Sequence, residues 1–140
     1  MSQVPSDRRP ILVADDDADI RTLVCIRLEH EGHTTMCAEN GDEALRLVKE
    51  RTPKLCVLDI VMGATSGLDV LRELRATPET RRVPVLLLSA SVQEADVKRG
   101  LELGADGYLQ KPFHHEELIG RVSQLLEGEL KEPVRAGQFQ

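Results

Sequence analysis

Five polar residues with side chains suited to ion or phosphate chemistry stand at the ends of short aliphatic stretches. Three are carboxylates, one is a hydroxyl and one is an ammonium: Asp15, Asp16, Asp59, Ser89 and Lys111. Carboxylate oxygens are the ligands that hard divalent cations prefer, and a carboxylate can also attack phosphorus to form an acyl phosphate. A hydroxyl and an ammonium can bind phosphoryl oxygens. These residue types indicate metal-assisted phosphoryl chemistry if the fold brings them together.

The stretches before these residues are typical of buried parallel strands, which read as uninterrupted aliphatic runs. The runs are ILVA at 11–14, LCVL at 55–58, VLLL at 85–88 and YL at 108–109. In open α/β sheets, ligands bind outside the carboxyl ends of the strands, where the strand order reverses. All five polar residues are therefore expected at one edge of a sheet.

Strand and helix patterns alternate along the whole chain. The strands are predicted near 11–15, 34–38, 55–59, 83–88 and 106–109, and the helices near 18–31, 41–51, 68–76, 92–103 and 115–128. Apolar residues recur at helical spacing in the helical segments, and glycine or proline falls at the joints between elements. Right-handed crossovers between such units give an α/β fold, a doubly wound parallel sheet of five strands with helices on both faces.

The bulk composition fits one domain with an aliphatic core. The chain has 140 residues, no Trp, one Tyr, two Phe and a net charge of −6. We expect a polar N-terminal leader at 1–9, the domain at 10–128, and a flexible tail or linker stub at 129–140, where no apolar periodicity remains. The acidic balance argues against direct nucleic-acid binding. No apolar run is long enough for a membrane span, and no signal peptide is evident.

The three cysteines lie inside apolar segments. They are Cys25, Cys37 and Cys56, an odd number. We interpret them as reduced packing residues of a cytoplasmic protein.

Four fragments, in this order and at these separations, resemble the receiver domain of two-component response regulators. They are ILVADDDADIR, LCVLDIVMGATSGLDVL, VPVLLLSAS and GADGYLQKPF, and the resemblance covers residues 10 to about 128. It implies the flavodoxin-like strand order 2-1-3-4-5 with five helices. The sequence departs from the family at Gly63, where proline is frequent, whereas Gly67 matches.

The resemblance also implies a role for each carboxylate. Asp59 is the expected phosphoryl acceptor. Asp16, Asp59 and the backbone carbonyl of Val61 are expected to bind Mg²⁺, with Mn²⁺ as an alternative ion, and Asp15 is expected to act through water. From the residues alone, Asp15 and Asp16 could instead compensate the dipole of the following helix, and Asp17 is expected to cap it.

Ser89, Lys111 and Tyr108 complete the expected site. Ser89 is placed to donate to a phosphoryl oxygen, and Lys111 to pair with the acceptor carboxylate or its phosphate. By resemblance, the Lys111–Pro112 bond is cis, and Tyr108 swings inward when Ser89 is drawn to the phosphate. The face formed by 92–103, 106–109 and 115–128 would then change its partners. Gly100 lies inside the helix predicted at 92–103, which we therefore expect to be mobile.

Three functions are compatible with this pattern. The first is a signalling module that takes a phosphoryl group from a histidine kinase or histidine phosphotransfer protein, modifies only itself, and acts on a downstream protein or a second copy of itself. The second is a small Mg²⁺-dependent aspartyl-phosphate phosphohydrolase. However, such enzymes tend to place a second Asp where this chain has Val61. The third is a degenerate receiver used only as a binding platform, which the retention of all five polar residues disfavours.

Overall fold

The computed structural model describes residues 7–90 and 94–128. Five parallel strands form one sheet in the order β2-β1-β3-β4-β5, which confirms the predicted α/β fold and its strand order. The strands are β1 (Ile11–Ala14), β2 (Thr35–Ala38), β3 (Leu55–Asp59), β4 (Val85–Ser89) and β5 (Gly107–Gln110). The helices are α1 (Ala18–His30), α2 (Gly41–Glu50), α3 (Gly67–Ala76), α4 (Glu94–Glu102) and α5 (His115–Leu126).

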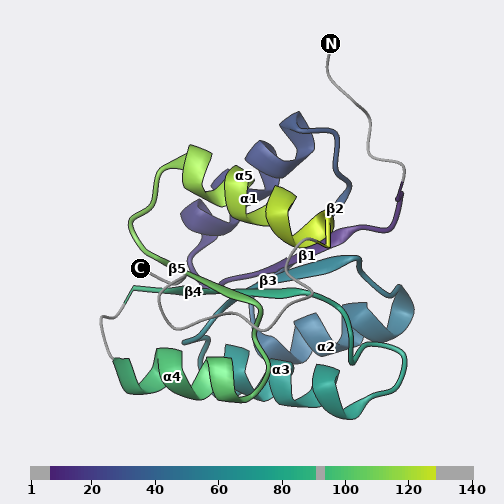
Figure 1. The fold of residues 1–140 in the computed structure, drawn as a ribbon, viewed down its shortest axis with the longest axis vertical. Helices are drawn as coiled ribbons and strands as arrows, with labels where there is room; N and C mark the ends of the chain where they lie inside the picture. The colour runs from purple at the N-terminus through teal and green to yellow at the C-terminus, as the bar shows by residue number, and fades with distance from the viewer. Residues whose placement is uncertain (1–6, 91–93, 129–140) are drawn as a thin grey trace.

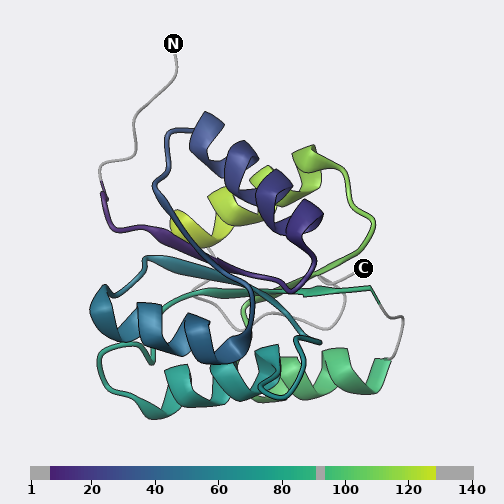
Figure 2. The same cartoon turned by 180° about the vertical axis from the view of Figure 1, so that it is seen from behind.

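The molecule has three layers, with helices on both faces of the sheet. Helices α1 and α5 cover one face, and α2, α3 and α4 cover the other (Figures 1 and 2). Each face has its own aliphatic core, because successive strand residues point to opposite sides. Leu12 and Leu58 pack with α2 and α3, whereas Val13 and Val57 pack with α1 and α5. This double burial explains the uninterrupted aliphatic runs of the strands.

Helix boundaries follow local capping chemistry. The Asp17 side chain accepts from the backbone N–H groups of Asp19 and Ile20, so it caps α1 as expected. Ser66 and Asp69 form a capping box at the start of α3. The first two residues of the helix predicted at 92–103 lie outside the described residues, as do most of the leader and the tail. Within the leader, the Asp7 carbonyl accepts from Lys54 Nζ at 2.8 Å.

Gly100 has a packing role in α4. It is buried, and a Cβ atom there would overlap the Leu87 side chain of β4. A larger residue would hold the helix away from the sheet. The glycine that suggested a mobile helix is therefore also what allows α4 to approach β4 closely.

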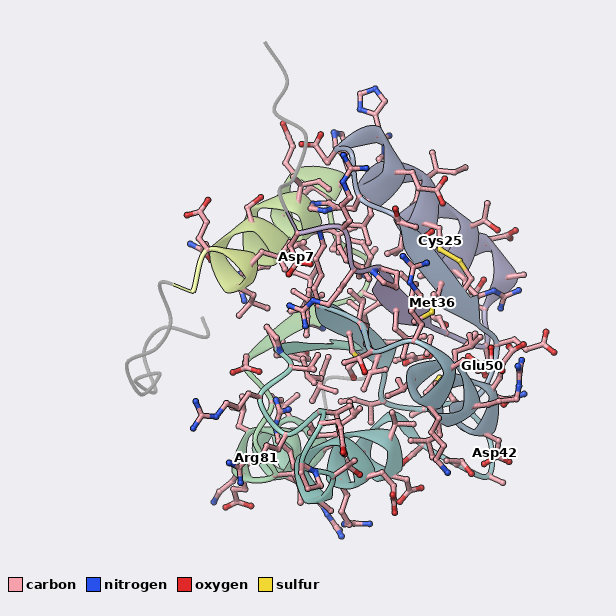
Figure 3. The ribbon with its side chains drawn as sticks, turned by 90° about the vertical axis from the view of Figure 1, so that its right-hand side faces the viewer. Asp7, Cys25, Met36, Asp42, Glu50 and Arg81 are labelled. Atoms are coloured by element: carbon pink, nitrogen blue, oxygen red, sulfur yellow. A yellow bond between two sulfur atoms is a disulfide. The ribbon has the colours of Figure 1, made fainter. Side chains whose placement is uncertain are left out.

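The prediction that all the cysteines are reduced is wrong for two of them. Cys25 of α1 and Cys37 of β2 form a disulfide, visible as a yellow bond beside the Cys25 label in Figure 3, and only Cys56 is free. The pairing arises because α1 packs over the β1–β2 edge of the sheet, where Cys37 lies in register with Val13. Helical and strand periodicities alone do not reveal this contact between two elements.

Candidate functional site

Three carboxylates meet at the carboxyl ends of β1 and β3. Asp15 and Asp16 directly follow β1, and Asp59 is the last residue of β3. In the register of these neighbouring strands Ala14 lies beside Leu58, so Asp15 falls next to Asp59. One oxygen from each of the three carboxylates lies within 4.8 Å of the others. Asp15 and Asp59 are buried, whereas Asp16 is exposed at the mouth of the cluster.

Lys111 brings a positive charge to the buried pair of carboxylates. Its Nζ lies 2.7 Å from Asp15 Oδ2 and 3.4 Å from Asp59 Oδ2. Lys111 was expected to pair with Asp59, but its shorter contact is to Asp15. Burial lowers the pKa of Lys111, but the hydrogen bond to Asp15 and the two nearby negative charges outweigh that effect, so the net shift is upward. The ammonium therefore remains charged while neutralising part of the cluster.

The surroundings of Asp59 raise the pKa of its side chain. Burial is the largest cause and the charge of Asp15 the second, and together they raise the pKa of Asp59 to about 7, against the opposing effect of Lys111. Two buried carboxylates and one lysine leave an excess negative charge in a poorly solvated site. A bound cation would relieve that excess.

Ser89 and Tyr108 lie on the neighbouring strands β4 and β5, where Tyr108 is in register with Leu87. Ser89 is the buried last residue of β4, one position beyond Leu88, which lies beside Asp59. Tyr108 is half-buried on β5, and its carbonyl accepts from Arg121 of α5 at 3.0 Å. The Lys111–Pro112 peptide bond is cis. Tyr108, Lys111, Pro112 and Arg121 line one hollow of about 350 Å³.

The loop after β3 begins close to the Asp59 side chain. The Val61 N–H donates to Asp59 Oδ1 at 3.3 Å, and the Val61 side chain is 63% exposed. Gly63 has φ +79°, a backbone conformation that glycine adopts without strain. A Cβ atom on Gly67 would overlap the Asp59 carbonyl, so glycine is needed there for α3 to start so close to β3.

Two hydrogen bonds to the backbone of Asp15, which were not predicted from the sequence, hold this residue in place. Arg21 of α1 donates to the Asp15 carbonyl at 2.8 Å, and the Asp15 N–H donates to the Ala38 carbonyl of β2 at 3.1 Å. The Asp15 side chain in turn accepts from the Asp17 N–H at 2.9 Å. The spacing of Arg21 from Asp15 in the sequence does not by itself indicate this hydrogen bond.

The donor set fits a hard divalent cation. All the side-chain ligands on offer are carboxylate oxygens, which suit Mg²⁺ and Mn²⁺ and give no thiolate or imidazole to favour Zn²⁺. The raised pKa of Asp59 is a second indication, since the described residues supply only one ammonium at this cluster of three carboxylates.

Among the described residues, no helix is both long and apolar enough to cross a bilayer.

Comparisons with known proteins agree with this geometry. The family model described as "Response regulator receiver domain" matches residues 11–123. The phosphate regulon transcriptional regulatory protein PhoB of Pseudomonas aeruginosa is 35% identical over 133 residues, which cover 92% of this chain and 58% of PhoB. The DNA-binding response regulator MtrA of Mycolicibacterium paratuberculosis is 41% identical over 127 residues, covering 91% of this chain and 55% of MtrA.

A solved structure shows the same likeness. The receiver domain of the Francisella response regulator 1452 superposes with a TM-score of 0.78 at 36% identity, covering 86% of this chain and 98% of that one. The chain spans little more than half the length of these two curated relatives. The chain therefore belongs to the receiver-domain family of two-component response regulators.

Proposed function

We propose that Asp59 accepts a phosphoryl group from a phosphohistidine on a histidine kinase or a histidine phosphotransfer protein. The observation that carries this proposal is the convergence of Asp15, Asp16, Asp59 and Lys111 at one edge of the sheet. An Asp59 oxygen attacks phosphorus, the phosphorus–nitrogen bond breaks, and the imidazole leaves with the electron pair. The product is an acyl phosphate, which water later hydrolyses.

The chain's own residues would position and neutralise this reaction. Asp16, Asp59 and the Val61 carbonyl would hold Mg²⁺, with Asp15 acting through water. When bound, the ion supplies positive charge next to the developing phosphoryl charge. Lys111 already contacts Asp59. After phosphorylation its ammonium would pair with the phosphate, as a second positive charge beside Mg²⁺. Ser89, at the end of the neighbouring strand, would donate its hydroxyl to a phosphoryl oxygen.

Phosphorylation would then be read out on the face formed by α4, β5 and α5. A phosphate adds about −1.5 to −2 charges, enough to bias a two-state element nearby. Tyr108 is the proposed reporter, because it is half-buried on β5 and lines the same hollow as Lys111. We propose that this face binds a downstream protein or a second copy of the chain, and that the domain works in the cytoplasm.

Acetyl phosphate with Mg²⁺ tests this function by intact mass. We expect a gain of one phosphoryl group in the wild type, no gain in Asp59→Asn, and the same gain in Asp19→Asn, an exposed acid of α1 outside the cluster. An unchanged gain in Asp59→Asn would contradict the proposal. Sustained release of phosphate from small phosphate esters would instead favour the phosphohydrolase, since a receiver turns over only its own acyl phosphate.

A further inference from the structure

The Cys25–Cys37 disulfide joins the two elements that hold Asp15. Arg21, one helical turn before Cys25, donates to the Asp15 carbonyl at 2.8 Å. Ala38, the residue after Cys37, accepts from the Asp15 N–H at 3.1 Å. The Asp15 carbonyl is thus bonded to a side chain of the helix that carries Cys25, and the Asp15 N–H to the residue that follows Cys37. The covalent bond links α1 to β2 across the backbone position that orients Asp15 in the acidic cluster.

The two cysteines differ in exposure in a way that suits reversible exchange. Cys37 is exposed on the edge strand β2, whereas Cys25 is a buried residue of α1. A soluble disulfide can reach the first cysteine, and the second is already beside it to complete the reaction. Cys56 offers no such route, because it is fully buried in β3 and burial raises its thiol pKa to about 12.

We propose that Cys25 and Cys37 form a reversible thiol–disulfide site whose oxidised form fixes α1 against β2 around Asp15, so that the oxidised domain binds Mg²⁺ more tightly than the reduced one. The effect on the ion rests on the proposed function of the acidic cluster. Its physical basis is preorganisation: a cross-link that limits the movement of Asp15 before binding lowers the entropy lost when the ion binds. Permanent disulfides are rare in the cytoplasm, so a site there would be exchangeable.

The exchange balances with a low-molecular-weight disulfide as oxidant. The Cys37 thiolate attacks one sulfur of that disulfide, forming a mixed disulfide and releasing one thiolate, which takes up the proton that Cys37 lost. The Cys25 thiolate then attacks the Cys37 sulfur and releases the second small thiol. The net change oxidises two cysteine thiols to one disulfide and reduces the external disulfide to two thiols.

The first test follows the bond itself. The reduced wild-type protein is incubated with oxidised glutathione, free thiols are alkylated, and peptides are identified by mass spectrometry. We expect a Cys25–Cys37 linked peptide, reversed by reduced glutathione, with Cys56 still in the thiol form. Cys56→Ala is expected to form the same link, and Cys37→Ser to form neither the link nor a stable adduct at Cys25. A Cys37 adduct that never resolves onto Cys25 would overturn the site.

The second test measures Mg²⁺ affinity by calorimetry on the oxidised and reduced protein. Removing a group that hydrogen-bonds a metal ligand alters metal affinity by roughly 10- to 100-fold. For this more distant constraint we expect a shift of roughly 3- to 10-fold toward tighter binding on oxidation, present in Cys56→Ala and absent in Cys37→Ser. Equal affinity in both redox forms would overturn the coupling while leaving the proposed function intact. No Mg²⁺ binding in either form would contradict the coupling and the proposed function together.

Discussion

At the scale of single residues, the site is defined by an imbalance of charge. Lys111 contacts both buried carboxylates, yet the pKa of Asp59 is still raised to about 7. The sequence was enough to predict that Asp59 and Lys111 lie at the carboxyl ends of strands in one parallel sheet. It was not enough to predict that Lys111 lies nearer to Asp15 than to Asp59, since that depends on side-chain reach across three strands.

The raised pKa of Asp59 gives the metal-free protein a specific pH dependence. Between about pH 4 and pH 7 the unfolded chain releases the Asp59 proton while the folded state keeps it, so this group lowers stability as the pH rises through that window. We expect Asp59→Asn to remove this loss and to be more stable than the wild type by about 1–2 kcal/mol at neutral pH. Urea unfolding at several pH values, with a chelator present to remove metal ions, measures the difference in free energy of unfolding between the two proteins.

Asp19→Asn is the control for that series, because Asp19 is exposed and lies outside the cluster. A difference between Asp59→Asn and the wild type that stays constant with pH would contradict the assigned titration. Added Mg²⁺ is expected to stabilise the wild type and to lose most of that effect in Asp59→Asn, since only the native state holds the ligands together.

Lys111→Met tests the ion pairs. Removing the ammonium leaves buried Asp15 and Asp59 without their cation, and we expect a loss of about 2–3 kcal/mol in the metal-free protein. Mg²⁺ is expected to recover part of that loss by supplying positive charge. Lys49→Met, at an exposed position of α2, is expected to stay within about 0.5 kcal/mol. Equal losses in the two variants would show that the Lys111 ion pairs are not stabilising.

At the scale of the elements, glycines decide how closely helices approach the sheet. Gly67 lies against the Asp59 carbonyl and Gly100 lies against Leu87, whereas a Cβ on Gly120 of α5 would meet nothing within 4 Å. From the sequence, Gly100 indicated only that its helix is mobile. Its packing role depends on the path of β4 beneath α4, which local helix propensity does not contain.

Alanine substitutions at Gly67 and Gly120 compare a glycine that lies against the sheet with one that faces open space. Gly67→Ala is expected to destabilise the fold by about 2–3 kcal/mol, because the Asp59 backbone must move to admit the methyl group. It is also expected to slow phosphorylation by acetyl phosphate. Gly120→Ala, in the open interior of α5, is expected to stabilise by about 0.5–1 kcal/mol. Thermal unfolding measures both, and a neutral Gly67→Ala would contradict the close approach.

Helix α4 is expected to exchange its amide protons faster than α1. Among the described side chains of α4, Gly100 alone is buried, whereas α1 buries Val24, Cys25 and Leu28. A helix with so little buried apolar surface opens at low free-energy cost. Hydrogen exchange of the unphosphorylated protein measures this directly. Protection of α4 equal to that of α1 would rule out a mobile α4 as the responding element.

At the scale of the whole molecule, the fold was predictable because each level of the sequence agrees with it. Aliphatic runs, helical spacing and joints at glycine or proline all indicate alternating strands and helices, and the polar residues then fall at one edge. The Cys25–Cys37 bond and the bonds of Arg21 and Ala38 to Asp15 were not predictable. They join α1 to β2 through contacts that no periodicity specifies.

Paramagnetic broadening by Mn²⁺ in amide NMR spectra is the most direct test of a shared ion site at residues 15, 16 and 59. With substoichiometric Mn²⁺, we predict selective loss of signals near Asp16, Asp59, Val61 and Lys111, and unaffected signals at the opposite edge of the sheet around Lys54. Asp59→Asn should need much more Mn²⁺ for the same loss. Broadening centred on other acidic surfaces, or unchanged in Asp59→Asn, would contradict a single metal site built from these carboxylates.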